Sequence, residues 1–474
     1  MKEMVISSRR DFLKQSGVAT VGFLGLYQFV NPLVGAEVGG QIAGYGPLLE
    51  DPNGILNLPK GFSYKIISKK GQPMDDGLLT PGRPDGMGAF QGPKGRIILV
   101  RNHENSPDEF ENGAFGANNE LLHKADVSKF YELGKGELPG LGGTTTMIYN
   151  PKSGIVEESY LSLAGTVRNC AGGITPWKSW LTCEESTVTV GSYSGKLEKD
   201  HGYVFEVPAS KKTKLFESKP IKEMGRFNHE AVAVDPRTSI VYLTEDRGDG
   251  LFYRFIPDTP GKLHMGGRLQ ALAIAGDKSC DTRNWKGMES PKFPKNEALQ
   301  VVWIDLEEID SPEDDLRYRG YEQGAACFAR GEGIWFGDGE LYFACTNGGE
   351  ISAGQVFRYK PGQNEGKSNE RDSPGVLELF AEPNDKEILK SCDNVAIAPW
   401  GDLLLCEDNP HPFVVGITPE GEFYKLAENI GFRSEFAGGV FAPDGLTYFV
   451  NIQEAGLTLA ITGPWSDKIK SYRG

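Results

Sequence analysis

The sequence has no surplus of positive charge and lacks the cysteine spacing of a zinc knuckle. Of its 474 residues, 50 are Lys or Arg and 65 are Asp or Glu, which gives a formal net charge of −15. Such acidity argues against a nucleic-acid-binding protein, because phosphate backbones are neutralised by basic surfaces. It leaves hard cations open as ligands. The 7 cysteines are odd in number and contain no C-x-x-C pair, so at least one thiol is unpaired and a zinc knuckle is not expected.

Helical periodicity is also scarce, and only one short helix, near Asn119–Glu132, is predicted. Glycine is abundant instead, with 61 residues beside 29 prolines. This composition predicts many turns between short strands and excludes a helical bundle. Neither a Walker-type phosphate loop nor a G-x-S-x-G nucleophile elbow occurs, which removes the two commonest sequence signals for nucleotide binding and serine hydrolysis.

The first 36 residues have the pattern of an export signal. Arg9 and Arg10 precede Asp11 and two apolar residues, a weakly apolar stretch follows from Gly17 to Val30, and small residues end the segment. The apolar stretch is shorter than the ~20 residues that span a bilayer. We therefore predict a twin-arginine signal peptide over residues 1–36. The mature chain is expected to be periplasmic or secreted through the twin-arginine export machinery, with no stable membrane anchor after cleavage.

One sequence pattern recurs six times. An apolar stretch leads through a turn to a second apolar stretch that ends in acids or amides. The two polar ends are 15 residues apart in Cys170–Glu185, Glu230–Glu245, Glu332–Asn347, Gly438–Gln453 and Gly88–His103, and 14 apart in Asn394–Asp408. Two short strands and a tight turn have this length. Six hairpins predict an all-β fold, a six-bladed β-propeller over residues 37–474 that forms a single catalytic domain. A pair of β-sandwiches is the alternative.

Strand-like segments between the hairpins are expected to build the outer parts of the blades. They are residues Gly202–Val207, Gln355–Tyr359 and Val414–Thr418. Residues 105–142 and 258–325 are too long for blade loops and are predicted to be long loop insertions.

A hairpin returns the chain to the end that it left, so the polar ends of all six units are expected to meet at one mouth of the central channel. Carboxylate and amide oxygens suit Ca²⁺ or Mg²⁺, whereas a thiolate and imidazoles favour a transition metal such as iron or zinc. The predicted metal ligands are Cys170, Glu184, Glu185, Glu230, Glu245, Glu332, Asp393, Asn394 and Glu407. Cys183 and Cys406 lie in apolar runs and are expected in the core.

Arg330 stands two residues before Glu332, so in extended backbone both side chains point to the same mouth. Its planar guanidinium could hold two phosphate oxygens. The alternative is that Arg330 only neutralises nearby acids.

Seven short motifs occur along the chain: Arg101-Asn102-His103-Glu104, Gly142-Gly143-Thr144-Thr145-Thr146, Asn169-Cys170-Ala171-Gly172-Gly173-Ile174-Thr175-Pro176-Trp177, Cys183-Glu184-Glu185, Gly225-Arg226-Phe227-Asn228-His229-Glu230, Arg330-Gly331-Glu332-Gly333 and Asp393-Asn394-Val395. Together they resemble the motifs of the PhoX-type bacterial alkaline phosphatases. The resemblance implies a six-bladed propeller with two Fe³⁺ and three Ca²⁺ ions and a bridging oxo group. It implies that Cys170 ligates iron, that Glu230 and Glu332 bind metal, and that Arg330 contacts phosphate. Glu104 is assigned with Arg330 to substrate binding.

The predicted function is that of a secreted, metal-dependent phosphomonoesterase that releases phosphate from organic esters. Two alternatives remain at this stage. One is a calcium-dependent propeller hydrolase of lactones or phosphotriesters, which would give Cys170 no role. The other is a non-catalytic propeller whose acids bind structural calcium.

Overall fold

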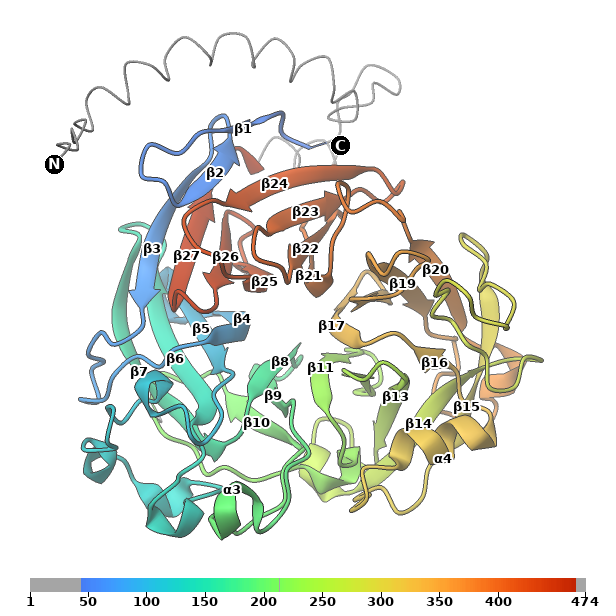
Figure 1. Cartoon of the computed structure of the whole chain (residues 1–474), viewed down its shortest axis with the longest axis horizontal. Helices are drawn as coiled ribbons and strands as arrows, with labels where there is room; N and C mark the ends of the chain where they lie inside the picture. The colour runs from blue at the N-terminus through green and yellow to red at the C-terminus, as the bar shows by residue number, and fades with distance from the viewer. Residues whose placement is uncertain (1–43, 213, 466–474) are drawn as a thin grey trace, which may run out of the picture.

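The computed structural model describes residues 44–212 and 214–465, which form an all-β, propeller-like ring of sheets (Figure 1). The predicted signal peptide, residues 1–36, lies outside these residues and stays a prediction. No helix in the described ranges is long and apolar enough to cross a membrane.

Six antiparallel hairpins surround the centre of the ring. Their strands are β4 (Pro84–Gln91) with β5 (Ile97–His103), β8 (Asn169–Ile174) with β9 (Ser179–Glu184), β11 (His229–Val234) with β12 (Val241–Glu245), β17 (Gly331–Gly337) with β18 (Glu340–Cys345), β21 (Cys392–Ile397) with β22 (Leu403–Glu407), and β25 (Phe436–Phe441) with β26 (Thr447–Ile452). The first strand of each hairpin contacts the first strands of both neighbours, and β25 closes the ring against β4. All six predicted repeats therefore form hairpins around one centre, and the alternative of two β-sandwiches is wrong.

The hydrogen-bonded sheets do not divide into the six separate blades that the repeats predict. Two sheets have four strands, β4–β5–β6 (Gly142–Asn150)–β7 (Ile155–Thr166) and β25–β26–β27 (Leu457–Thr462)–β3 (Ser63–Lys69). A third has three strands, β8–β9–β10 (Val204–Pro208), and a fourth has six, with β23 (Phe413–Ile417), β24 (Phe423–Asn429), β2 (Leu56–Pro59) and β1 (Leu48–Leu49) added to β21–β22.

The number of separate sheets is smaller than six because the hairpins β11–β12 and β17–β18 share one ten-stranded sheet. Its outer strands are β13 (Gly250–Pro257), β14 (Gly267–Ile274), β15 (Leu299–Asp305), β16 (Cys327–Phe328), β19 (Gln355–Lys360) and β20 (Val376–Ala381). Strand β15 pairs with β14 over five residues and with β20 over two, which joins the two halves. The predicted outer strands are confirmed as β10, β19 and β23.

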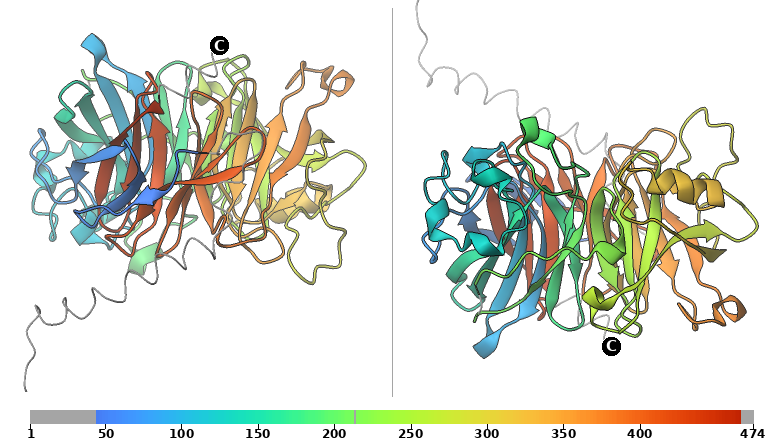
Figure 2. Two further views of the ribbon diagram at one scale, coloured as in Figure 1. Left: turned by 90° about the horizontal axis from the view of Figure 1, so that it is seen from above. Right: turned by 90° about the horizontal axis from the view of Figure 1, so that it is seen from below.

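The ring is closed by strands from both ends of the described chain. Strand β3 pairs along β27, and β2 pairs with β24 (Figure 1). In side view the sheets stand next to one another with loops above and below them (Figure 2). Buried apolar clusters fill the space between neighbouring sheets. All seven cysteines are buried and free, and Cys183 and Cys406 lie in this core as predicted.

Both predicted insertions differ from simple loops. Residues 105–142 contain the 3₁₀ turns η2 (Phe110–Asn112), η3 (Leu122–Lys124), η4 (Val127–Lys129) and η5 (Gly134–Gly136), so the predicted helix over Asn119–Glu132 is wrong. Residues 258–325 contain η7 (Leu263–Met265), strands β14 and β15 and helix α4 (Leu316–Gln323). The prediction missed these strands because the apolar runs are separated by long polar segments.

Every hairpin carries a β-bulge at the start of its first strand. The register shifts between Pro84 and Met87 in β4, and at the matching place in β8, β11, β17, β21 and β25. Two bulged residues oppose one residue of the partner strand, which re-aims the first side chain of each bulge. The first bulged residues are Asp85, Cys170, Glu230, Glu332, Asp393 and Gly438.

At two contacts between neighbouring hairpins, the second bulged residue of one hairpin is a glycine, Gly86 or Gly333. A Cβ atom on Gly86 would lie 2.5 Å from the Cα atom of Ala171, the second bulged residue of the next hairpin. A Cβ atom on Gly333 would lie 2.6 Å from the Cα atom of Asn394, again the matching position of the next hairpin. Backbone approaches backbone here, so only glycine fits without movement of the sheets.

We expect Gly333→Ala to lower the free energy of unfolding by about 1–3 kcal/mol, because the added methyl group overpacks two inner strands. Gly248→Ala is the control, since its nearest neighbour would be a Trp285 side-chain atom at 3.6 Å. Denaturant unfolding of both variants measures the difference. Equal stabilities of the two variants would contradict the close inter-strand packing.

Candidate metal centre

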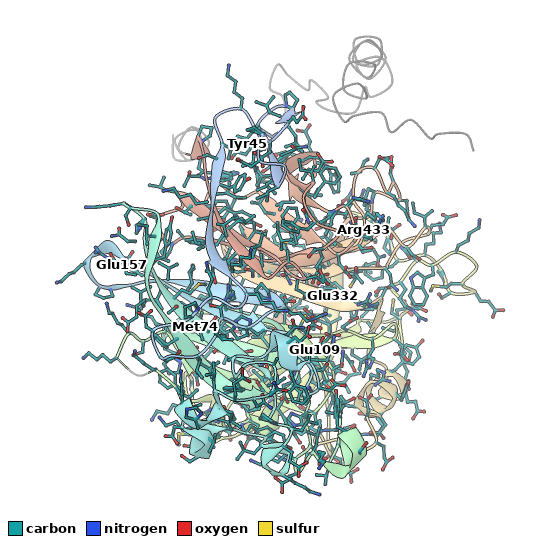
Figure 3. The ribbon with its side chains drawn as sticks, turned by 60° about the vertical axis from the view of Figure 1, so that its left-hand side comes forward. Tyr45, Met74, Glu109, Glu157, Glu332 and Arg433 are labelled. Carbon is teal, nitrogen blue, oxygen red and sulfur yellow. The ribbon has the colours of Figure 1, made fainter. Side chains whose placement is uncertain are left out.

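The starts of the inner strands open into a polar cavity of about 250 Å³. Ten carboxyl side chains and three arginines line it, together with one thiol and one amide: Asp85, Glu104, Glu185, Glu230, Asp246, Glu332, Asp393, Asp408, Glu435, Glu454, Arg83, Arg168, Arg330, Cys170 and Gln453. Glu332 lies near the middle of the molecule in Figure 3. The bulges bring these residues together, since five of the six first bulged residues line the cavity.

A thiol stands among the carboxyl groups in the cavity. The Sγ atom of Cys170 lies 3.1 Å from Oε1 of Glu230 and 3.8 Å from Oδ2 of Asp85. Three groups of side chains each offer ligand atoms within 4.8 Å of one another: Glu104–Cys170–Glu185, Asp85–Glu104–Glu435 and Glu230–Glu332–Asp393. The first group contains the thiol, and the other two offer oxygen atoms alone. This donor set suits a transition metal beside hard cations.

Mutual proximity and burial perturb these acids strongly. Burial, and then the charge of Glu104, raises the pKa of Asp85 to about 8. The same two causes raise the pKa of Glu185 to about 8, although Arg168 opposes them. Burial followed by neighbouring carboxylates raises the pKa of Glu230 and of Glu332 well above the usual range. Without bound cations the cavity would hold protons instead, since so many charges cannot share one buried space.

Two buried oxygen atoms in the cavity have no protein partner among the described residues. They are Oε2 of Glu230 and Oε1 of Gln453. Gln453 donates from Nε2 to Asp85 at 2.6 Å and to Glu104 at 2.9 Å, which fixes its amide while the carbonyl oxygen stays unpaired. Buried acceptors of this kind need a partner. The residues present therefore fit bound cations.

A second repeated feature lies at the rim of the cavity. Just after the second strand of each hairpin, one main-chain N–H donates to a carbonyl oxygen just before the first strand. The pairs are Glu104 to Arg83, Glu185 to Arg168, Asp246 to Asn228, Thr346 to Arg330, Asp408 to Ser391 and Gln453 to Glu435, at 2.8–3.3 Å. The six hairpins thus place twelve rim residues in equivalent positions.

Arg330 is held at this rim by two acids. Its Nε and Nη2 atoms donate to the two carboxylate oxygens of Asp246 at 2.6 and 2.7 Å, and Nη2 lies 3.2 Å from Glu332. The Arg330 backbone is left-handed, with φ of 53°. Its Nη1 atom has no protein acceptor among the described residues. Arg330 does neutralise acids, and it also keeps one amino group available to a ligand.

Four predicted ligands do not line the cavity: Glu184, Glu245, Asn394 and Glu407. Glu184, Glu245 and Glu407 are the last residues of β9, β12 and β22. Each carboxylate accepts main-chain N–H groups at or just before the third strand, such as Gly202 at 2.8 Å, Leu251 at 3.1 Å and Phe413 at 2.9 Å. Side chains alternate along a strand, so the next residue faces the cavity: Glu185, Asp246 and Asp408. The ligand prediction for Glu184, Glu245 and Glu407 is therefore corrected.

Two further predicted residues have protein partners that suggest other roles. The Oδ1 atom of Asn394 accepts the N–H of Gly438 and its Nδ2 donates to Asp393 at 3.1 Å, so Asn394 joins two hairpins. Both carboxylate oxygens of Glu104 contact arginines, Arg83 at 2.6 Å and Arg168. Glu104 lines the cavity and orients the side chains of these two arginines. The other predicted residues, Cys170, Glu185, Glu230, Glu332, Asp393 and Arg330, all line the cavity.

Eight lining residues are not among the predicted site residues: Arg83, Asp85, Arg168, Asp246, Asp408, Glu435, Gln453 and Glu454. A signal existed for some of them. Strand alternation distinguishes Asp246 and Asp408 from the acids before them, and Arg168 precedes Cys170 as Arg330 precedes Glu332. Asp85 and Glu435 each lie three residues before the start of a predicted repeat, at Gly88 and Gly438, so neither was counted among the polar ends.

Comparisons with known proteins give a structure with the same fold and a matching family. The structure of Pseudomonas fluorescens PhoX in complex with vanadate, described as a transition state analogue, is 17% identical over 88% of this chain and 97% of that chain, with a TM-score of 0.61. A gluconolactonase from Xanthomonas campestris is 13% identical over 82% and 89%, with a TM-score of 0.34. No curated protein sequence matches. The family profile "Alkaline phosphatase PhoX" matches residues 43–150 and 141–456. The chain belongs to the PhoX alkaline phosphatase family.

Proposed function

We propose that this alkaline phosphatase hydrolyses phosphate monoesters at the cavity formed by the inner strands, with iron and calcium as its cations. The observation that carries the proposal is the grouping of a thiol, buried carboxylates with unpartnered oxygens, and Arg330 in one cavity. Cys170 and its neighbours Glu185 and Glu230 would hold iron, and Glu332 and Asp393 would share the remaining cations. Two Fe³⁺ and three Ca²⁺ ions with a bridging oxo group are the proposed cofactor. When bound, such cations neutralise the oxygens of the phosphoryl group.

The protein's own contribution is to orient the guanidinium group of Arg330 beside the metal ions. Asp246 and Glu332 fix the Arg330 side chain through three polar contacts. The free Nη1 atom of Arg330 would donate to a phosphoryl oxygen, and the bond would strengthen as negative charge grows on that oxygen in the transition state. The acids that hold Arg330 keep it positioned before the substrate arrives, so little reorganisation is needed during the reaction.

The proposed location is the periplasm or the outside of the cell, reached by the twin-arginine route. This proposal is supported by the paired Arg9 and Arg10 and the short apolar stretch that follows them. Organic phosphate esters would be the substrates there. Turnover of p-nitrophenyl phosphate together with elemental analysis tests the function. Iron near two per chain with calcium is expected, and calcium without iron would contradict the proposed centre.

Arg330→Ala is expected to lower the turnover of p-nitrophenyl phosphate on the order of 10²-fold, because a transition-state contact is lost. Arg247→Ala is the matched control, since Arg247 is similarly exposed, contacts Asp314 at 3.5 Å and does not line the cavity. Metal content is measured in both variants. A metal-loaded Arg330→Ala protein with wild-type turnover would show that Arg330 only balances charge.

Cys170→Ser is expected to remove iron, visible colour and activity, because a thiolate ligand to iron gives the charge-transfer colour and a hydroxyl group does not replace it. Cys406→Ser is the control. Cys406 is buried in an apolar cluster, with its sulfur 3.9 Å from the hydroxyl of Tyr448. It should change stability alone. Absorption spectra and elemental analysis decide, and a coloured, iron-loaded Cys170→Ser protein would refute the ligand assignment.

Removal of the metals is expected to make stability fall as pH rises. The folded chain holds protons on Asp85 and Glu185 up to a pKa of about 8, whereas the unfolded chain releases them near pH 4. Between these values the folded state binds more protons, so its stability decreases with rising pH. Melting temperatures from pH 5 to 8 should fall more steeply for chelated than for reconstituted protein. Parallel profiles would contradict a cavity that cations neutralise.

A further inference from the structure

Arg168 occupies the same structural position as Arg330. Each arginine lies two residues before the first bulged residue of its hairpin, Cys170 or Glu332, and each has left-handed backbone, with φ of 48° and 53°. Each carbonyl oxygen accepts the same rim hydrogen bond. A left-handed backbone is unusual for a residue with a side chain. Arg83, with φ of 42°, has the same backbone position before Asp85, so three hairpins present an arginine to the cavity from this position.

The side-chain contacts of the two arginines also correspond. Each guanidinium reaches a carboxylate of the preceding hairpin, Glu104 for Arg168 and Asp246 for Arg330. Each also contacts an acid of its own hairpin, and for Arg168 this is Glu185, at 2.5 Å from Nη2. The Arg168 side chain is 33% exposed, and its Nη1 atom has no protein acceptor among the described residues. Arg168 thus has a hydrogen-bond donor to offer to a ligand in the cavity.

The two arginines serve different sides of the cavity. Arg168 precedes β8 and Arg330 precedes β17, and β11 lies between these strands (Figure 1). Arg330 contacts the Glu230–Glu332–Asp393 group, whereas Arg168 contacts Glu104 and Glu185 of the thiol-containing group. A phosphoryl group held by Arg330 leaves the donor of Arg168 free for another part of the same substrate.

The negative charge of the cavity limits the chemical nature of this second part of the substrate. With ten carboxyl groups around the cavity, an anionic leaving group meets repulsion unless a cation faces it. The free Nη1 atom of Arg168 can donate one charge-assisted hydrogen bond to a carboxylate oxygen. A singly charged carboxylate also meets less repulsion here than a second, doubly charged phosphate group would.

We propose that Arg168 binds a carboxylate carried by the leaving alcohol, so that the enzyme accepts phosphate esters of hydroxy acids. This inference rests on the proposed phosphatase site and adds a substrate class to it. Arg168 is then a specificity residue of the leaving-group side, and Arg330 remains the contact to the phosphoryl group.

The test compares kcat/KM for 2-phosphoglycerate and for glycerol 2-phosphate, in which a hydroxymethyl group replaces the carboxylate. Arg168→Gln should lower kcat/KM for 2-phosphoglycerate at least about tenfold more than for glycerol 2-phosphate, the size of a lost charge-assisted hydrogen bond. Arg83→Gln is the matched control. Arg83 has the same backbone position, but its Nε and Nη2 atoms bind Glu104 of its own hairpin, at 3.0 and 2.6 Å. The ratio of the two kcat/KM values should stay within about twofold of the wild-type ratio in that variant.

Equal losses for both substrates, or the same change of ratio in Arg83→Gln, would overturn the proposal. If Arg168→Gln does not fold or loses its metals, Arg168→Lys replaces it, because lysine keeps the charge beside Glu104 and Glu185 without the planar fork. That variant should still lower the ratio about threefold or more, and an unchanged ratio would overturn the proposal. Failure of the phosphatase function itself would appear separately, as absent wild-type turnover of glycerol 2-phosphate.

Discussion

The crowding of carboxyl groups in one buried cavity is the constraint on which the rest of this structure depends. Asp85, Glu230, Glu332 and Asp393 approach one another at the starts of four inner strands, beside the thiol of Cys170. Their repulsion favours protonation or bound cations, and it would push the strands apart if nothing else held them. The surrounding sheets supply that restraint through apolar packing, and the arginines at the rim offset part of the charge.

The repeated bulge explains how a simple hairpin can present such groups. A regular strand would turn alternate side chains into the sheets on either side, whereas the bulge gives one extra residue and re-aims it toward the centre. The glycines that follow let neighbouring backbones approach closely. At the other end of each unit, Glu184, Glu245 and Glu407 bind main-chain N–H groups of the chain returning to the third strand. Adjacent acids in the sequence thus separate into one that fixes the fold and one that lines the cavity.

The six hairpins repeat the same backbone structure, but the side chains at equivalent positions differ in their chemistry. The six residues at the rim position before the inner strands are three arginines, one asparagine, one serine and one glutamate: Arg83, Arg168, Arg330, Asn228, Ser391 and Glu435. The first bulged residue varies in the same way, from thiol to carboxylate to glycine. Function in this fold depends on which side chain stands at each equivalent position. The similarity to Pseudomonas fluorescens PhoX at 17% identity concerns the ring of sheets, and the family motifs concern the cavity.

The sequence by itself determined the all-β class, the six hairpins and the core of the candidate site. These features are local, since strand periodicity and turn residues repeat within about 15 residues, and Cys170, Glu230, Glu332 and Arg330 stand next to recognisable hairpin starts. Strand alternation in the sequence puts the two acids of each pair on opposite faces, and the tertiary structure decided which face points into the cavity. It also decided the pairing of β15 with β20, which merged two predicted blades, and the position of Asp85 and Glu435 beside Glu104. These contacts join residues far apart in the chain, and their distances are set by the packing of whole sheets around the centre.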